Sequence, residues 1–250
     1  MKTAIITGAS TGVGLEFVRQ IKNTFPEITE YWVVARRLDR LQSIAVEGVT
    51  VRPLPLDLTA PDSMALLQAE LERSAPEVSL LVGNAGCGYL GNFDESDLEE
   101  QLRMVDLNIR ALTAVTRLVL PYMEQGGRII NMSSIASFVP NPRMTIYSAT
   151  KSYVSAFSRG LHEELKPRNI SVTAVCSGPM DTEFIRLGRI KGASRTFDVL
   201  PYCDPVKVVR GALMAARKGR AVYTPKAFYK LYRVLSALIP HALLIHAAKT

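Results

Sequence analysis

Residues 7–14 read Thr7-Gly8-Ala9-Ser10-Thr11-Gly12-Val13-Gly14 and follow directly on an apolar run at 3–7. The apolar run predicts a buried strand, and we expect a helix from about Gly12. Glycines at such a junction allow a tight turn and a close backbone approach to a pyrophosphate, and the positive N-terminal end of the helix attracts that anion. The stretch predicts a nucleotide-binding turn. The alternative is a turn that uses glycine only for its backbone freedom and binds no nucleotide.

The rest of the chain alternates short apolar runs with amphipathic stretches, which is typical of a parallel sheet covered by helices on both faces. We expect helices from near Gly12, Leu38, Pro61, Leu98, Ile146 and Pro205. The expected strands are 3–7, 31–35, 49–53, 80–83, 128–131, 171–176 and 221–223. The prediction is a single α/β domain over 1–225, doubly wound around a seven-stranded parallel sheet, followed by an apolar and basic helical extension over 226–250.

Three side chains carry the predicted chemistry. Tyr147 and Lys151 are four residues apart, so on a helix they share one face. A phenol with its ordinary pKa of about 10 exchanges protons poorly at neutral pH, and a nearby ammonium lowers that pKa. Ser134 follows the apolar run 128–131 and places a hydroxyl beside the phenol. The three groups predict a proton donor for a carbonyl oxygen.

In their order and spacing, the glycine turn, Asn84-Ala85-Gly86, Ser134 and the Tyr147–Lys151 pair resemble the compact, single-domain branch of the short-chain dehydrogenase/reductase family, over residues 1–223. The resemblance implies a Rossmann-type fold and a catalytic set of Asn108, Ser134, Tyr147 and Lys151. In this set Tyr147 donates the proton and Ser134 hydrogen-bonds the same oxygen. Lys151 also grips the nicotinamide ribose, and Asn108 interrupts a helix and holds a water leading to the lysine. The interval of 13 residues to Tyr147 favours Ser134 over Ser133.

The same resemblance implies which residues bind the cofactor. Gly8, Ser10, Thr11, Gly12, Val13 and Gly14 would hold the pyrophosphate. Adenine would lie at Asp57 and Leu58, although Asp57 could instead cap the turn before the helix near Pro61. Asn84, Ala85 and Gly86 would pack over the adenosine ribose, and Gly178, Pro179 and Thr182 would hold the nicotinamide. Two positions depart from the family pattern: Gly83 replaces an asparagine and Ser177 replaces a proline.

The end of the second strand predicts the cofactor. A carboxylate there would bind the ribose 2′-hydroxyl of NAD(H). Ala35 lies 21 residues after Gly14, and Arg36 and Arg37 follow it with no acid between them. Guanidinium groups form bidentate bonds to a phosphate, so we expect NADP(H) rather than NAD(H). The alternative is a solvated basic loop whose arginines pair with acids such as Asp39.

Composition limits the partners. The net charge is +7, but lysines and arginines are scattered among 23 acidic residues apart from Arg36-Arg37 and the C-terminal segment. We therefore expect no nucleic acid. Cys87, Cys176 and Cys203 are widely spaced, which favours a reducing, cytoplasmic location, and no metal ligand set is present. By resemblance, the chain forms a homodimer or homotetramer through helices within 98–120 and 146–165.

Two segments bear on the substrate. By resemblance, residues 183–203 form a mobile lid, whose Arg186, Arg189, Lys191 and Arg195 could meet an acidic substrate or a phosphopantetheine carrier; we favour a solvated face. The extension over 226–250 is too short in apolar sequence to span a membrane. It could cover an apolar substrate pocket, pack on a subunit or make peripheral contact with a membrane surface. We favour a packed tail and an apolar substrate.

Three functions fit these features. The first is NADPH-dependent, reversible reduction of a small-molecule ketone or aldehyde, hydroxysteroid-like compounds included. The second is reduction of a 3-oxoacyl thioester on a carrier. The third, a regulator that senses NADPH without turnover, is disfavoured because Ser134, Tyr147 and Lys151 are all present.

Overall fold

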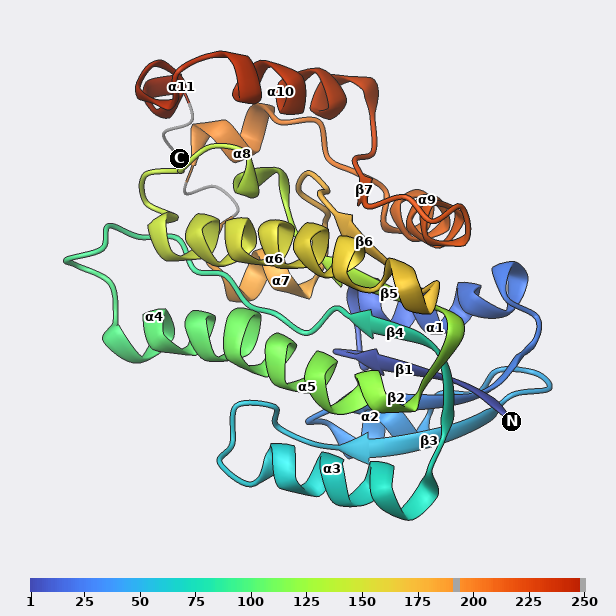
Figure 1. The fold of residues 1–250 in the computed structure, drawn as a ribbon. Coiled ribbons are helices and arrows are strands. Elements are labelled where there is room, and N and C mark those ends of the chain that lie inside the picture. The colour runs from blue at the N-terminus through green and yellow to red at the C-terminus, as the bar shows by residue number, and fades with distance from the viewer. Residues whose placement is uncertain (191–193, 248–250) are drawn as a thin grey trace.

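The computed structural model describes residues 1–190 and 194–247 (Figure 1). Seven parallel strands form one sheet in the order β3-β2-β1-β4-β5-β6-β7. The strands are β1 (Lys2–Thr7), β2 (Ile28–Ala35), β3 (Thr50–Pro55), β4 (Glu77–Gly83), β5 (Met123–Met132), β6 (Ser171–Val175) and β7 (Val222–Tyr223). The predicted doubly wound α/β fold is confirmed. Its strand order reverses between β1 and β4, where the carboxyl ends of strands leave a crevice for a ligand.

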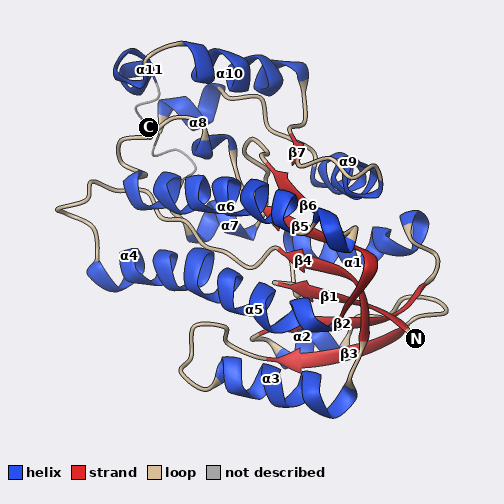
Figure 2. Ribbon diagram, viewed as in Figure 1, coloured by secondary structure: helices blue, strands red, loops and turns tan. Residues whose placement is uncertain are grey.

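Helices cover both sides of the strands (Figure 2). Alternate residues of each strand point to opposite faces, so Ala4 and Ile6 join one core while Ile5 joins the other. The first core contains side chains of α1 (Gly12–Thr24), α2 (Leu38–Gln42) and α9 (Pro205–Arg217). The second contains side chains of α3 (Ser63–Ser74) and α5 (Leu112–Val119), while α6 (Thr145–Glu164) packs on β6. Burial on both faces explains why the strands read as continuous apolar runs.

Some boundaries differ from the prediction. β5 begins at Met123, not at 128, because it continues through Gly126 and Gly127. The helix expected from Pro61 begins at Ser63, since the turn at Asp57–Ala60 occupies the residues before it. Pro205, by contrast, occupies the first turn of α9, and the carboxylate of Asp204 accepts a hydrogen bond from the Val206 amide at 2.9 Å.

One long helical stretch runs from Leu98 to Val119 and is not a regular α-helix. It consists of α4 (Leu98–Val105), a π-helical turn at Asp106–Ala111 and then α5. Asn108 lies within the π-turn. The expectation of a helix interrupted at Asn108 agrees with this geometry, and such turns occur often at functional sites.

The last third of the chain adds short helices near the carboxyl ends of the strands. Two, α7 (Glu183–Leu187) and α8 (Arg195–Val199), lie within the expected lid. Lys191 of that lid lies outside the described residues, and so do residues 248–250 of the tail. The tail forms α10 (Ala227–Leu238) and α11 (His241–Ala247), which Figure 1 shows side by side above α8. None of the helices described is long and apolar enough to cross a membrane.

Candidate active site

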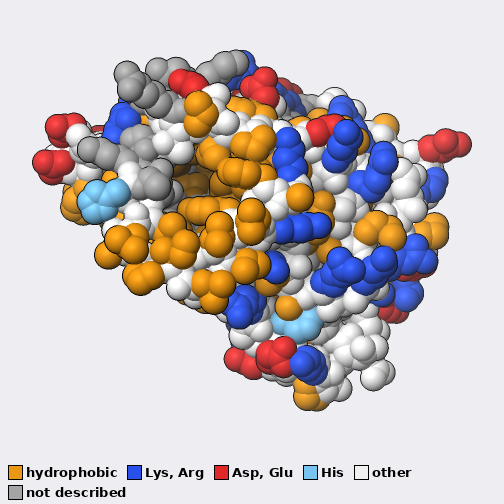
Figure 3. Space-filling model, turned by 90° about the horizontal axis from the view of Figure 1, so that it is seen from above, with side chains coloured by type: hydrophobic (Ala, Val, Ile, Leu, Met, Phe, Trp, Pro, Cys, Tyr) orange, Lys and Arg blue, Asp and Glu red, His pale blue; other side chains and the backbone are white. Residues whose placement is uncertain are grey.

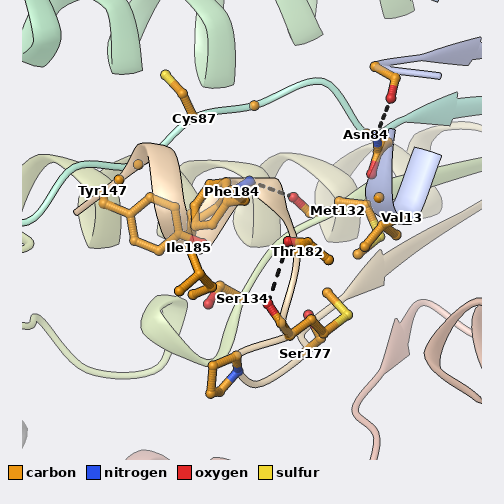
Figure 4. A pocket seen from close by; sticks show the side chains of 18 of the residues that line it. Val13, Asn84, Cys87, Met132, Ser134, Tyr147, Ser177, Thr182, Phe184 and Ile185 are labelled. Atoms are coloured by element: carbon orange, nitrogen blue, oxygen red, sulfur yellow. Dashed lines mark hydrogen bonds between the residues drawn. The ribbon is translucent and has the colours of Figure 1, made fainter. Parts of the chain in front are cut away.

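A cavity of about 520 Å³ lies where β1, β4, β5 and β6 end. Nearly every residue predicted for the site lines it. The two exceptions are Gly14 and Asn108, which lie directly behind its wall. Figure 4 shows the two ends of this space, with Val13 and Asn84 at one end and Ser134, Tyr147 and Phe184 at the other. The sequence-predicted residues are therefore brought together in one elongated pocket.

The glycine turn forms one wall of the cavity. Gly8 has φ +67°, a conformation that L side chains rarely adopt, and a methyl group on Gly14 would collide with the Gly8 carbonyl. The Asn84 amide holds the turn by donating to the Thr7 carbonyl at 3.0 Å. Thr11 precedes α1 without capping it through its side chain, and the first turn of α1 has no acidic residue. Free backbone amides at a helix N-terminus bind phosphate, so the turn fits the pyrophosphate of a dinucleotide.

Tyr147 and Ser134 form the opposite end of the cavity. Burial raises the pKa of Tyr147 to about 12, while a hydrogen bond with Ser134 acts to lower it. The phenol ring packs against Phe184 with ring centroids 5.7 Å apart. We expected the Lys151 ammonium to lower this pKa, but in this structure burial outweighs every other influence on the phenol. A buried, protonated phenol aimed into a cavity is suited to donating a proton.

Lys151 lies behind the tyrosine, one helical turn further along α6. Its Nζ is 5.7 Å from the Tyr147 ring centroid and donates to the Met132 carbonyl at 2.8 Å. Burial lowers the pKa of Lys151 to about 8. The ammonium is thus fixed at the end of β5 and titrates close to physiological pH.

Asn108 supports this end of the site from the π-turn. Its amide accepts from the Cys87 backbone N–H at 2.9 Å and donates to the Cys87 carbonyl at 2.8 Å and to Thr150 at 3.0 Å. A methyl group on Gly86 would lie 2.9 Å from its Oδ1 and 3.4 Å from Lys151 Nζ. Asn108 therefore holds the segment after β4 close to the lysine.

Arg36 and Arg37 lie at the other end, beyond β2. Arg37 does not pair with Asp39 but forms a bidentate ion pair with Glu183 of α7, at 2.8 and 3.2 Å. Its Nη2 also lies 3.3 Å from the Thr11 hydroxyl. Arg36 is largely exposed, and its Nη1 is 3.9 Å from Asp57. Arg37 is thus directed at the glycine turn, with a carboxylate on its guanidinium.

Asp57 builds the turn before α3, which is one of the two roles considered for it. Its Oδ1 accepts from the Thr59 amide at 3.0 Å and from the Thr59 hydroxyl at 2.7 Å, which closes the turn before α3. Its Oδ2 lies 3.6 Å from Arg103 of α4. Burial acts to raise the pKa of Asp57, but the hydrogen bonds from Thr59 and the charges of two nearby arginines together outweigh it, and the net shift is downward. The carboxylate both builds the turn and lines the cavity.

Comparison with known proteins identifies the family. The family model for short chain dehydrogenase matches residues 2–189. The chain belongs to the short-chain dehydrogenase family. This is a family of NAD(P)-dependent oxidoreductases.

Relatives of the chain span several branches of that family. A probable NADP-dependent dehydrogenase from Haemophilus influenzae is 36% identical over 192 residues, which cover 73% of this chain and 73% of that protein. A very-long-chain 3-oxoacyl-CoA reductase from Anas platyrhynchos is 31% identical over 198 residues. The match covers 74% of this chain but only 62% of that reductase.

Two solved structures share the whole architecture. A short-chain dehydrogenase from Sphingobium yanoikuyae in complex with NADPH superimposes with a TM-score of 0.80 at 30% identity, covering 95% of this chain and 94% of that one. A bulky-bulky ketone specific alcohol dehydrogenase from Comamonas testosteroni gives a TM-score of 0.74 at 28% identity, covering 95% and 93%.

Gly83, where the chain departs from the short-chain dehydrogenase pattern, has a specific packing consequence. A methyl group at this position would collide with Asn131 of β5 and with Leu112. The Asn131 amide donates to Ser158 at 3.0 Å, but its buried Oδ1 has no hydrogen-bond partner within the described residues. The amide missing at Gly83 is therefore not replaced by another donor.

The loop after β6 carries the other departure. Thr182 lies opposite the glycine turn, and a methyl group on Gly12 would approach its side chain at 3.5 Å. Gly178 packs directly on the Tyr229 ring, and the Tyr229 hydroxyl donates to the Pro201 carbonyl at 2.9 Å. The tail of the chain thus supports the loop in which Ser177 replaces the proline of the family pattern.

Sequence reasoning missed several groups that line the cavity. Arg103 and Glu183 are charged residues whose partners lie far away in sequence, so no spacing rule could have found them. Gly88 packs against the Tyr147 ring so closely that a methyl group would lie 2.7 Å from it. That glycine follows a recognised segment and was detectable as a site of close approach. Of the lid cations, Arg189 pairs with Glu100 of α4 while Arg186 is exposed.

Proposed function

We propose that this short-chain dehydrogenase catalyses the reversible NADPH-dependent reduction of an apolar ketone or aldehyde to an alcohol. One observation carries the proposal: a buried Tyr147 hydroxyl, hydrogen-bonded to Ser134, lies in the same cavity as an uncapped helix N-terminus that fits a pyrophosphate.

The chain's own residues would act as follows. NADPH, when bound, supplies the hydride. Ser134 donates a hydrogen bond to the carbonyl oxygen as negative charge develops there, and Tyr147 transfers its proton to the same oxygen. The Lys151 ammonium, 5.7 Å from the phenol ring, stabilises the tyrosinate that remains. Asn108 keeps the backbone after β4 against the lysine.

The choice of NADPH over NADH rests on the end of β2. Arg37 points at Ser10 and Thr11 of the glycine turn, at 3.4 and 3.3 Å, where a ribose 2′-phosphate would follow the pyrophosphate. Arg37 is not held in this position by an ion pair with Asp39, the alternative considered from the sequence. The NADPH complex of the Sphingobium relative and the name of the Haemophilus relative support the same cofactor.

The lining of the catalytic end supports the proposal of an apolar substrate. It is mostly aromatic and aliphatic, and is formed by Tyr89, Met144, Phe184, Ile190, Phe197 and Tyr232. Such a surface excludes water from the reacting carbonyl and favours a bulky apolar group. The Comamonas relative, described as specific for bulky-bulky ketones, supports this class.

A second candidate is reduction of a 3-oxoacyl thioester. The relative from Anas platyrhynchos is a very-long-chain 3-oxoacyl-CoA reductase, and Arg186 on α7 stays exposed for an anionic carrier group. Arg189 supports it less, because Glu100 already pairs with it.

The assembly and location are also proposals. α4 exposes an apolar stripe, Leu98, Leu102 and Val105, on the helices through which we propose a homodimer or homotetramer. The three cysteines are free thiols, which supports a reducing, cytoplasmic setting.

The test begins with titration of NADPH and NADH by fluorescence, using wild type and the Arg36→Ala/Arg37→Ala double variant. We expect tighter NADPH binding that collapses in the variant, followed by oxidation of NADPH with bulky ketones. Tyr147→Phe should bind NADPH as wild type does and lose turnover by orders of magnitude. Equal affinities would refute the cofactor choice. Binding of NADPH without turnover of any carbonyl compound would favour the regulator that senses NADPH. A preference for 3-oxoacyl-CoA over ketones would favour the second candidate.

A further inference from the structure

The net positive charge of the protein is concentrated in its last segment. Residues 205–250 contain nine lysines and arginines and no aspartate or glutamate. The preceding 204 residues hold the other 21 cations together with all 23 acids. The whole excess of +7 therefore comes from residues 205–250, because the rest of the chain holds more acids than cations. Clustered cations of this kind attract anionic surfaces.

Helix α10 exposes a stripe of apolar side chains on the side that faces away from the body of the protein. Its buried side chains, Tyr229 and Ser236, face the body of the protein. Five large apolar side chains at helical spacing face away from it and are 39–75% exposed: Phe228, Leu231, Val234, Leu235 and Leu238. Leu243 of α11 extends this stripe and is 69% exposed. These six residues form what we term the tail stripe.

The cations of α10 flank the tail stripe. Lys230 and Arg233 are three residues apart and share one side of α10, and Lys226 directly precedes the helix. The helix thus has an apolar face toward solvent, a basic row beside it and a third face on the protein. Helices with an apolar face and basic flanks lie in the headgroup region of a bilayer, with lysine and arginine stems reaching toward lipid phosphates.

The tail stripe is continuous with the rim of the substrate cavity. Phe228 both belongs to the stripe and lines the cavity, and Leu244 of α11 lines it too. On the lid side, Leu187 lines the cavity and is 65% exposed. Figure 3 shows this face, with apolar side chains around a hollow and lysine and arginine side chains gathered to one side. A partner on this face would therefore cover the cavity's rim.

The charge argues against a second copy of the chain as that partner. A two-fold interface places the same patch against itself, so the basic row would face its own copy. Like charges across an interface oppose association. An anionic lipid surface instead matches both the basic row and the tail stripe, since each cation near such a surface attracts it.

We propose that α10 and α11 dock on the surface of a bilayer rich in anionic phospholipid, with the tail stripe in the headgroup region and the cavity rim facing the lipid. An apolar substrate dissolved in the bilayer would then reach the cavity without crossing water. The docking itself does not depend on the proposed reaction.

The test is sedimentation of the full chain with vesicles of phosphatidylcholine alone or containing 40% phosphatidylglycerol. We expect binding to the anionic vesicles, weakened at least tenfold by Leu231→Ser/Leu238→Ser and strongly reduced by 0.5 M salt. The matched control, Leu66→Ser/Phe93→Ser, removes two similarly exposed apolar side chains elsewhere and should bind as wild type. NADPH binding by each variant reports that it is folded.

Three results would overturn the proposal. The first is no binding of the wild type to anionic vesicles. The second is binding that survives in Leu231→Ser/Leu238→Ser, which would place the lipid contact elsewhere. The third is a change of oligomeric state in that variant, measured by light scattering, with no lipid binding by the wild type. That outcome would assign the tail stripe to a second copy of the chain.

Discussion

Glu183 occupies the guanidinium of Arg37, so its charge should weaken the binding of NADPH. A 2′-phosphate that binds Arg37 must separate or share the bidentate pair at 2.8 and 3.2 Å. NADH has no such phosphate and leaves the pair intact. Glu183→Gln should therefore tighten NADPH selectively.

The magnitude follows from the exposure of the pair. The side chains of Arg37 and Glu183 are 39% and 25% exposed, and a partly exposed pair contributes about 1 kcal/mol or less. Removing it should lower the Kd for NADPH by up to about fivefold, since ~1.4 kcal/mol corresponds to tenfold. Arg37 lowers the pKa of Glu183 to about 2, below its ordinary value of 4.5. The pair is thus fully present above about pH 4.5 and is lost only as pH falls toward 2.

Calorimetry at pH 7 with NADPH, NADH, 2′,5′-ADP and 5′-AMP measures the effect. The gain should appear with NADPH and 2′,5′-ADP, and stay within twofold for the other two ligands. Asp198→Asn removes an exposed lid carboxylate elsewhere and is the matched control. An unchanged or weaker affinity of Glu183→Gln for NADPH would refute the reasoning.

Three shorter predictions concern the catalytic end. Because burial lowers the pKa of Lys151 to about 8, kcat/KM should fall as pH rises through 8 and the ammonium is lost; a flat profile to pH 9.5 would contradict this. Asn108→Ala strands the Cys87 amide and carbonyl, so thermal unfolding should show a loss of ~2–4 kcal/mol together with reduced kcat. Gly83→Ala should destabilise by ~1–3 kcal/mol in urea because its methyl group meets Asn131; wild-type stability would show that β4 moves freely.

Local sequence rules predicted the fold, and they named residues that the structure brings together around one cavity, where chemistry and spacing act together. The glycine turn is dictated by backbone geometry, and the Tyr147–Lys151 pair by the helical repeat. Both are short-range effects, which a sequence displays directly. The buried strands were recognisable for the same reason, because a sheet covered on both faces requires continuous apolar runs.

Long-range effects were not recognisable in this way. The partner of Arg37 is Glu183, 146 residues away, on helix α7, which was not among the helices predicted from the sequence. The net pKa shift of Tyr147 depends on how deeply the phenol is buried, and burial is a property of the packed chain. The sequence left the role of the C-terminal extension open and favoured a packed tail, because an apolar residue in a sequence does not show which face of its helix meets the protein.

The contact between Gly178 and Tyr229 couples the C-terminal helices to the loop after β6, so that the order of one should depend on the order of the other. Tyr229 lies at the start of α10, so the ring that supports the loop also fixes the first turn of the tail. If bound cofactor stiffens the loop after β6, the first turn of α10 should unfold less often. Protease cleavage within 230–247 should therefore be slower when NADPH is bound. Conversely, a chain shortened to before Tyr229 would lose the back support of its own cofactor loop, and truncation there would cost more than the removal of a surface helix.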